Sequence, residues 1–221
     1  MNKIKSIAAT CALCFCMYAR ADVITAYVSG NSRIDVALNN TIPYVAFQMD
    51  FTLPAGCSLA AQVVESKRLG KDMAWPTATW ADNSAQESRH KVYCRQIDTG
   101  RNVWRLVGYS LDNHIIDGLS SLNLFTLSVD GSTTDLQGGL SVHNVKFVNT
   151  DMEEHALSAS IEPLPAFGDV NQDGRVDILD VIAITDLQTG GTHTAYRPYA
   201  ADVDRDGAIE ADDAENVAKG L

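Results

Sequence analysis

The sequence predicts a mainly β protein, in which an N-terminal β-sandwich is followed by a small all-α C-terminal domain. Short runs with apolar side chains at every second position recur through residues 22–160, and turn residues separate them. A twelve-residue acidic segment begins at Asp169 and again at Asp202, and apolar residues at helical spacing follow each copy. The 221 residues suffice for one medium-sized domain and one small domain.

Residues 1–21 have the pattern of a secretory signal peptide. The start Met1-Asn-Lys3-Ile-Lys5 is basic, Ile7 to Tyr18 is apolar, and Ala19-Arg20-Ala21 fits a cleavage site. We therefore expect an exported protein that is secreted, periplasmic or held at the cell surface. Cys14 and Cys16 leave a lipoprotein as an alternative, although the residues before them do not suit lipid attachment. We expect no transmembrane segment, because the apolar run is too short to remain in a bilayer as a helix.

Residues 22–160 are expected to form the sandwich. The clearest strand is residues 45–53, where Phe47, Met49 and Phe51 alternate with more polar neighbours until Pro54-Ala-Gly56 ends the run. Asp98-Thr-Gly100-Arg-Asn102 indicates a hairpin between two strands. The other strands are expected at residues 34–38, 91–97, 103–110, 122–129 and 140–148, and residues 66–88 are expected to be mostly loop.

Removal of the signal peptide leaves Cys57 and Cys94 as the cysteines of the mature chain. In an exported protein these two residues form a disulfide or remain two separate buried thiols, and their spacing leaves both alternatives open.

The sequence offers no catalytic residues, which favours a protein without enzymatic activity. The His-Glu-x-x-His and Gly-x-Ser-x-Gly motifs are absent. A glycosidase needs two carboxylates across one cleft, and no two candidates are paired by the sequence. His155 fits a surface histidine better than a metal ligand. The candidate carboxylates are Asp50, Glu65, Glu87, Asp112 and Asp117.

Each acidic repeat has the ligand order of an EF-hand calcium loop. Oxygen-bearing side chains stand at positions 1, 3, 5, 9 and 12, glycine permits the sharp turn at position 6, and position 7 offers a main-chain carbonyl. We expect two calcium ions and, because the carboxylates repel one another, folding that depends on them. The predicted ligands are Asp169, Asn171, Asp173, Arg175, Asp177 and Asp180 in the first loop and Asp202, Asp204, Asp206, Ala208, Glu210 and Asp213 in the second.

The flanks of the loops distinguish them from an ordinary EF-hand. Pro163 and Pro165 exclude a regular helix before the first loop, so residues 161–167 are predicted to be a linker and residues 168–221 a separate domain. A helix is expected after each loop, the first ending at Gly190-Gly191. The apolar faces are expected at Val181, Ile182, Ile184 and Leu187 in the first helix and at Ala214, Val217, Ala218 and Leu221 in the second.

Residues 166–221 resemble a type I dockerin, through the runs Gly168-Asp-Val-Asn-Gln-Asp-Gly-Arg-Val-Asp-Ile-Leu-Asp180 and Ala200-Ala-Asp-Val-Asp-Arg-Asp-Gly-Ala-Ile-Glu-Ala-Asp-Asp213. This resemblance implies a calcium-dependent module that docks onto a cohesin domain, often in assemblies that degrade polysaccharides. It also implies that loop positions 10 and 11 contact the partner, which here are Ile178-Leu179 and Ala211-Asp212. These pairs depart from the Ser-Thr type of many dockerins and differ between the copies.

Residues 22–160 resemble, more weakly, a cohesin-like jelly-roll sandwich of the carbohydrate-binding-module type. The segments that show this resemblance are residues 34–40, 44–54, 124–127 and 142–147. This resemblance implies a sandwich that binds protein or glycan. Trp75, Pro76 and Trp80 could stack on sugar rings or pin their loop to the sandwich.

The leading functional interpretation is a secreted, non-catalytic assembly protein with a cohesin-type partner and a second protein or a polysaccharide as ligand. Because the chain would then carry both halves of a docking pair, head-to-tail self-association is a further expectation. The net charge of −11, of which residues 166–221 contribute −8 from 12 acidic and 4 basic residues, argues against nucleic acid as a partner. The alternatives are a small polysaccharide hydrolase or lyase carrying a dockerin, and a calcium-stabilised cap packed on its own sandwich.

Overall fold

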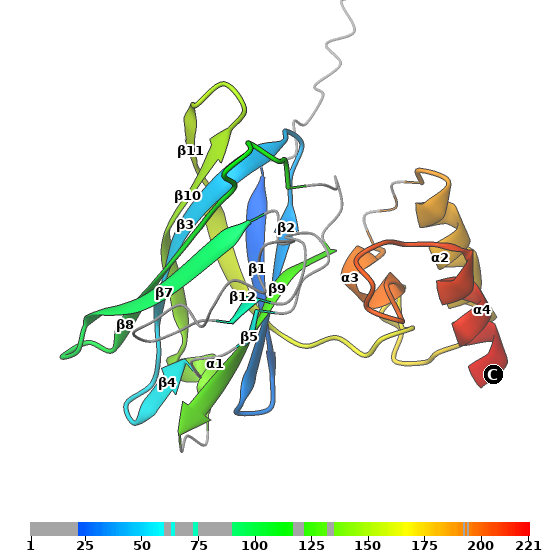
Figure 1. Ribbon diagram of the computed structural model, residues 1–221. Helices are drawn as coiled ribbons and strands as arrows, with labels where there is room; N and C mark the ends of the chain where they lie inside the picture. Colours follow the sequence, from blue (N-terminus) through cyan, green and yellow to red (C-terminus); the bar gives the residue numbers. More distant parts are fainter. Residues whose placement is uncertain are drawn as a thin grey trace, which may run out of the picture.

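The computed structural model describes residues 22–59, 63–64, 73–74, 90–116, 122–131, 135–191, 193 and 195–221. It shows two five-stranded sheets facing each other and a small helical region beside one of them (Figure 1). The predicted mainly β fold with an α-helical C-terminal domain is therefore confirmed. Several predictions fall outside the described residues, namely those on the signal peptide, on most of the 66–88 loop with Trp75, Pro76 and Trp80, and on Glu65, Glu87 and Asp117.

The first sheet has the strand order β12-β1-β2-β9-β4. Its neighbours pair antiparallel, except that β12 and β1 run parallel. The bounds are β1 Val23–Ser29, β2 Arg33–Asn39, β4 Cys57–Leu59, β9 Leu122–Gly131 and β12 Ser158–Pro163.

The second sheet has the order β11-β10-β3-β8-β7 and is antiparallel throughout. The bounds are β3 Tyr44–Thr52, β7 Lys91–Asp98, β8 Val103–Tyr109, β10 Ser141–Asn149 and β11 Glu154–Ala156. A short ribbon pairs β5, Val63–Val64, with β6, Met73–Ala74, and the one-turn helix α1 spans Leu136–Gly139.

The core lies between the two sheets and follows the predicted alternation. Phe47, Met49 and Phe51 on β3 are buried in it, as are Ile34, Val36 and Leu38 on β2. Phe47 stacks on Phe125 and on Phe147, with ring centroids 5.6 and 5.5 Å away. The inward-facing side chains of the two sheets thus pack together and form the core of the sandwich.

Three of the four strands at the sheet edges, β4, β11 and β12, were not predicted, because they are short or carry few large apolar residues. The inner strand β1 was not predicted either. β12 is Ser-Ala-Ser-Ile-Glu-Pro, and its last three residues lie in the range predicted as a linker. The N–H of Leu164 also donates to the carbonyl of Val28 at 3.0 Å, which continues the pairing with β1. A proline is tolerated at this place because β12 is an edge strand.

Cys57 and Cys94 are free thiols, so the alternative of two separate thiols is the one that the structure shows. Cys57 is buried in the core and Cys94 packs against it. Burial raises the pKa of the Cys94 thiol to about 12, which keeps it protonated and unreactive.

The C-terminal region contains α2 Ile178–Gln188, α3 Pro198–Ala201 and α4 Ala211–Gly220. Both predicted helices are present, and α3 is an additional turn before the second loop. A small core joins them through Val170, Ala183, Ile184, Ala201 and Val217.

The predicted apolar faces of α2 and α4 were partly wrong. Ile182, Ala218 and Leu221 are exposed, because the small core takes side chains from a narrower stripe on each helix. Within the part of the chain that the structure describes, every helix is too short or too polar to cross a lipid bilayer.

Candidate calcium-binding site

The two acidic loops share the same main turn. At position 1, Oδ2 of Asp169 accepts from the N–H of Gly174 at 3.1 Å, and Oδ2 of Asp202 accepts from Gly207 at 3.0 Å. Gly174 and Gly207 have φ of 84° and 89°, a conformation that favours glycine at position 6. The turn that brings position 1 toward position 6 is therefore encoded in both copies.

The carboxylate at position 12 closes each loop from inside. Oδ1 of Asp180 accepts from the N–H groups of Val170 and Asn171 at 2.8 and 3.1 Å, and its Oδ2 accepts from Asp177 at 2.9 Å. Asp180 is 0% exposed. This residue therefore ties positions 2, 3 and 9 together around one buried charge.

Asp213 repeats this arrangement in the second loop and is also buried. It accepts from Val203 at 2.7 Å and Asp204 at 3.3 Å through Oδ1, and from Glu210 at 2.9 Å through Oδ2. An ionised carboxylate offers about four lone-pair sites, so one site remains for a cation in each copy.

The donor set fits a calcium ion. Asp202, Asp204 and Asp206 hold carboxylate oxygens within 4.8 Å of one another. In the first loop, Oδ1 of Asp169 is buried without a hydrogen-bond donor, which a cation would satisfy. These are hard oxygen ligands of the kind that calcium prefers.

The remaining predicted ligands lie where the loop pattern puts them. At position 9, Asp177 caps α2 by accepting from the N–H of Leu179 at 2.8 Å, which suits a position that often binds calcium through water. The N–H groups of Arg175 and Ala208, at position 7, donate to Asp173 and Asp206 at 2.9 Å in both loops. Asn171 at position 3 accepts from the N–H of Asp173 at 2.8 Å.

Burial raises the pKa of Asp202 to about 7, and the negative charges of Asp213 and Asp206 add to this, against the lowering effect of N–H groups from Gly207 and Asp206. Burial also raises the pKa of Asp213 above its ordinary value, against N–H donation from Glu210. A bound cation would favour the ionised form of both carboxyls and so oppose the effect of burial.

The second loop is therefore expected to bind calcium more weakly as the pH falls below about 7, because calcium must displace the proton of Asp202. Weaker binding at lower pH follows from the raised pKa of Asp202, because the ligand-free carboxyl is protonated below that pKa and ionised above it. The affinity should fall about tenfold per pH unit in that range. Calcium titration calorimetry at pH 5.5 to 8 in two buffers of different ionisation enthalpy checks this, and binding without proton release at pH 6 would contradict it.

The four residues predicted to contact a partner occupy matching places. Ile178 and Leu179 open α2, and Ala211 and Asp212 open α4. All four are exposed. With Ile182, the first pair forms an apolar patch on α2 whose members are 59%, 54% and 55% exposed, in the order Ile178, Leu179 and Ile182.

Asp50 and Asp112, the two candidate catalytic carboxylates that the structure describes, are held by neighbouring side chains. Arg105 donates to Asp50 through Nε and Nη2, both at 2.7 Å, and Asn144 donates at 2.9 Å. Burial opposes ionisation of Asp50, but these bonds outweigh it and lower its pKa. Asp112 accepts from the hydroxyl of Ser110. The ring of His155 packs against Tyr44, with centroids 5.7 Å apart.

Sequence reasoning missed one functional feature of the second loop, the residue at position 4. Gln172 and Arg205 both stand there with φ of 61° and 63°. Gln172 is exposed, whereas Nη2 of Arg205 donates to Oδ2 of Asp35 on β2 at 2.8 Å. The residue types around Arg205 do not reveal a contact with a strand 170 residues away.

Comparisons with known proteins agree with this description. The family model of the type I dockerin domain matches residues 167–221. A comparison with curated proteins found no match. Solved structures with a similar fold include the sixth cohesin of scaffoldin B from Acetivibrio cellulolyticus in complex with a Cel5 dockerin, with a TM-score of 0.41 and 8% identity over 65% of this chain and 99% of that one.

Two further similar structures are cohesins as well. CaCohA2 from Clostridium acetobutylicum has a TM-score of 0.38 and 12% identity over 65% of this chain and 90% of that one. A non-cellulosomal cohesin from Archaeoglobus fulgidus has a TM-score of 0.36 and 16% identity over 64% and 86%. All three TM-scores lie below 0.5. The duplicated loop and helix, and the family match over the same segment, make residues 167–221 a type I dockerin domain.

Proposed function

We propose that this chain is an exported, non-catalytic assembly protein whose dockerin domain binds two calcium ions and docks onto a cohesin-type partner, in the context of polysaccharide degradation. The observation that carries the proposal is the apolar patch of Ile178, Leu179 and Ile182, which the first calcium loop presents on the surface of α2. Three adjacent aliphatic side chains exposed to water on one small domain are typical of a protein-binding surface.

The two repeats do not offer equal surfaces. At positions 10 and 11 the first repeat has Ile178 and Leu179, whereas the second has Ala211 and Asp212. Only the first pair supplies large apolar area, so the first repeat is the binding face and a symmetric dual mode is not expected. The capping of α2 by Asp177 holds this face in place next to the calcium loop.

Replacing Ile178 by aspartate is expected to weaken calcium-dependent binding to the cohesin-type partner by about 10- to 100-fold. The reason is the loss of an aliphatic side chain that the complex would bury, worth about 1.5–3 kcal/mol. The substitution should not harm folding, since an acidic residue is favourable in the first turn of a helix. Titration calorimetry against a panel of cohesin domains, with calcium and with a chelator, measures the effect.

The matched control is Ala211→Asp, which also places an aspartate at position 10, but in the second repeat. It should leave the affinity within about threefold of the unmodified protein, because a few tenths of a kcal/mol is usual for a surface change. Equal losses in both variants would show that the first repeat is not the binding face. Absence of calcium-dependent binding to every cohesin of the panel would overturn the proposal itself.

The sandwich has a surface of its own for a second protein or a glycan. The C-terminal helices lie beside the sheet that contains β1 and β2, and they leave the outer face of the other sheet uncovered (Figure 1). Strand register puts Tyr93, Arg95, Val107 and Tyr109 on that outer face, with the two tyrosine rings stacked at 6.0 Å. A flat pair of aromatic rings beside a cation fits a sugar ring or an acidic protein surface.

An acidic surface is also what a second copy of this chain would offer, since residues 166–221 carry a net charge of −8 from 12 acidic and 4 basic residues. Light scattering of the full chain with calcium and with a chelator distinguishes self-association from binding to another protein. A monomer under both conditions excludes self-association and leaves the second partner as a different molecule.

A further inference from the structure

The dockerin domain packs against the outer face of its own sandwich. The ring of Tyr199, on α3, stacks on the ring of Tyr27, on β1, with centroids 4.3 Å apart and 25° between the planes. Ala37 on β2 and the side chains of Leu164 and Phe167, from the segment between the domains, complete this apolar cluster. Figure 1 shows α3 on the side of the helical region that faces β1, β2 and β9.

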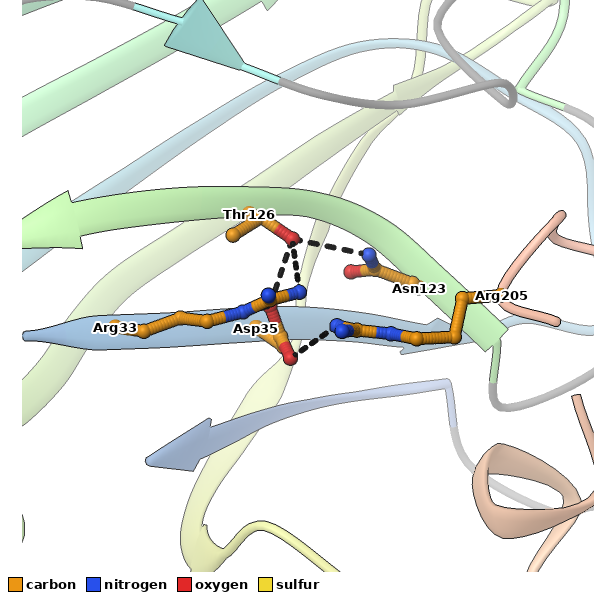
Figure 2. A network of polar contacts seen from close by, with 5 residues as sticks. All are labelled: Arg33, Asp35, Asn123, Thr126 and Arg205. Atoms are coloured by element: carbon orange, nitrogen blue, oxygen red, sulfur yellow. Dashed lines mark hydrogen bonds and ion pairs between the residues drawn. The ribbon is translucent and has the colours of Figure 1, made fainter. Parts of the chain in front are cut away.

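An ion pair lies beside the stacked rings. Asp35, on β2, is 0% exposed although its side chain is on the outer face of the sheet. Its Oδ1 accepts from Nε of Arg33 at 2.8 Å and from the hydroxyl of Thr126 at 2.7 Å, and its Oδ2 accepts from Nη2 of Arg205 at 2.8 Å. Figure 2 shows Asp35 between the two arginines, one from its own strand and one from the dockerin domain.

The second calcium loop fixes the direction in which the side chain of Arg205 points. It stands at position 4, between the predicted ligands Asp204 and Asp206, and its φ is 63°. The N–H of Asp206, the residue after Arg205, donates to both Asp202 and Asp204, at 2.9 and 3.0 Å. The backbone on the C-terminal side of Arg205 is therefore fixed by the same carboxylates that would hold the ion. The guanidinium also lies over the ring of Phe167, 5.0 Å from its centroid.

Without a cation, the three carboxylates within 4.8 Å of one another repel and favour an open loop. An open loop would not present Arg205 to Asp35. Asp35 would then keep Arg33 and Thr126 as partners, so the sandwich tolerates separation of the domains.

We propose that calcium binding in the second loop locks the dockerin domain onto its own sandwich through Arg205 on Asp35 and Tyr199 on Tyr27. The proposal rests on the calcium binding proposed above and adds a specific consequence to it. Because linkage is reciprocal, docking must raise the calcium affinity of the second loop by the factor by which calcium favours docking. The first loop, whose position 4 is the exposed Gln172, is not part of this coupling.

Arg205→Ala is the test, made in the full mature chain. With calcium present, the variant should show a larger radius of gyration by small-angle scattering than the unmodified protein, close to the value that both reach in chelator. One of its two calcium sites should weaken about tenfold, as expected for loss of a hydrogen bond between charged groups. Gln172→Ala, the same truncation at position 4 of the first loop, should change neither quantity.

Tyr199 provides a second pair of variants that does not touch a calcium loop. Tyr199→Phe keeps the ring that stacks on Tyr27 and should keep the compact form, whereas Tyr199→Ala should lose the ring contact and expand. An Arg205→Ala protein that stays compact with unchanged calcium affinity would overturn the coupling while leaving calcium binding intact. Absence of calcium binding in the unmodified chain would instead overturn both the proposed function and the coupling.

Discussion

Asp180→Ala is expected to abolish calcium binding in the first loop and to unfold the dockerin domain. The fully buried carboxylate of Asp180 accepts three main-chain N–H groups, from Val170, Asn171 and Asp177. Each donor left without an acceptor in a buried site costs about 1–3 kcal/mol, and the loop also loses a charged calcium ligand. A helical core as small as the one around Ile184 and Val217 cannot absorb a loss of that size.

The measurement is far-ultraviolet circular dichroism of the full chain during a calcium titration. The helical signal should appear on calcium addition in the unmodified protein and stay weak in Asp180→Ala at every calcium concentration. Asp212→Ala is the matched control, because Asp212 is an exposed aspartate at the start of α4 and not a predicted ligand. Retention of two calcium ions and full helical signal by Asp180→Ala would show that the position-12 carboxylate is not essential.

The fold of the two acidic loops could be predicted from the sequence because their structure is local. A twelve-residue loop contains its own acidic side chains and its own turn glycine, so the order of residue types determines how it folds. The hydrogen bonds of Asp180 and Asp213 repeat from one copy to the other for the same reason. The core strands β2 and β3 were predicted equally well, since the alternation of apolar side chains along them reports directly on burial between two sheets.

The contact between the domains could not be predicted in this way. Asp35 and Tyr27 are on the outer sides of two neighbouring strands, where alternation indicates exposure to solvent, yet both are buried and both contact the dockerin domain. Their partners Arg205 and Tyr199 lie in a loop and a four-residue helix, which carry no periodic signal. The exposure of Ile182 was missed for a related reason, because an apolar residue on a helix looks the same whether it faces the core or a partner.

Phe47→Ala is expected to destabilise the sandwich by about 3–5 kcal/mol, the usual cost of removing a buried phenylalanine. The ring of Phe47 joins the stack of Phe125 and Phe147 in the centre of the core. It also covers Gly108, where an added Cβ would lie 2.3 Å from Cε1 of Phe47. Because Gly108, the residue opposite Phe47 on β8, has no side chain, it cannot fill the cavity that the substitution leaves.

Thermal unfolding of the full chain in calcium measures this effect. The midpoint of the sandwich should fall by more than about 10 °C, given a few degrees per kcal/mol for a domain of this size. Phe47→Leu, which keeps much of the volume, should lose less than half as much. Because Tyr27 and Asp35 belong to the destabilised sandwich, its melting should release the dockerin domain, which then unfolds in a second transition set by calcium alone. A single transition that moves as a whole would instead show that the dockerin domain is stable only when docked.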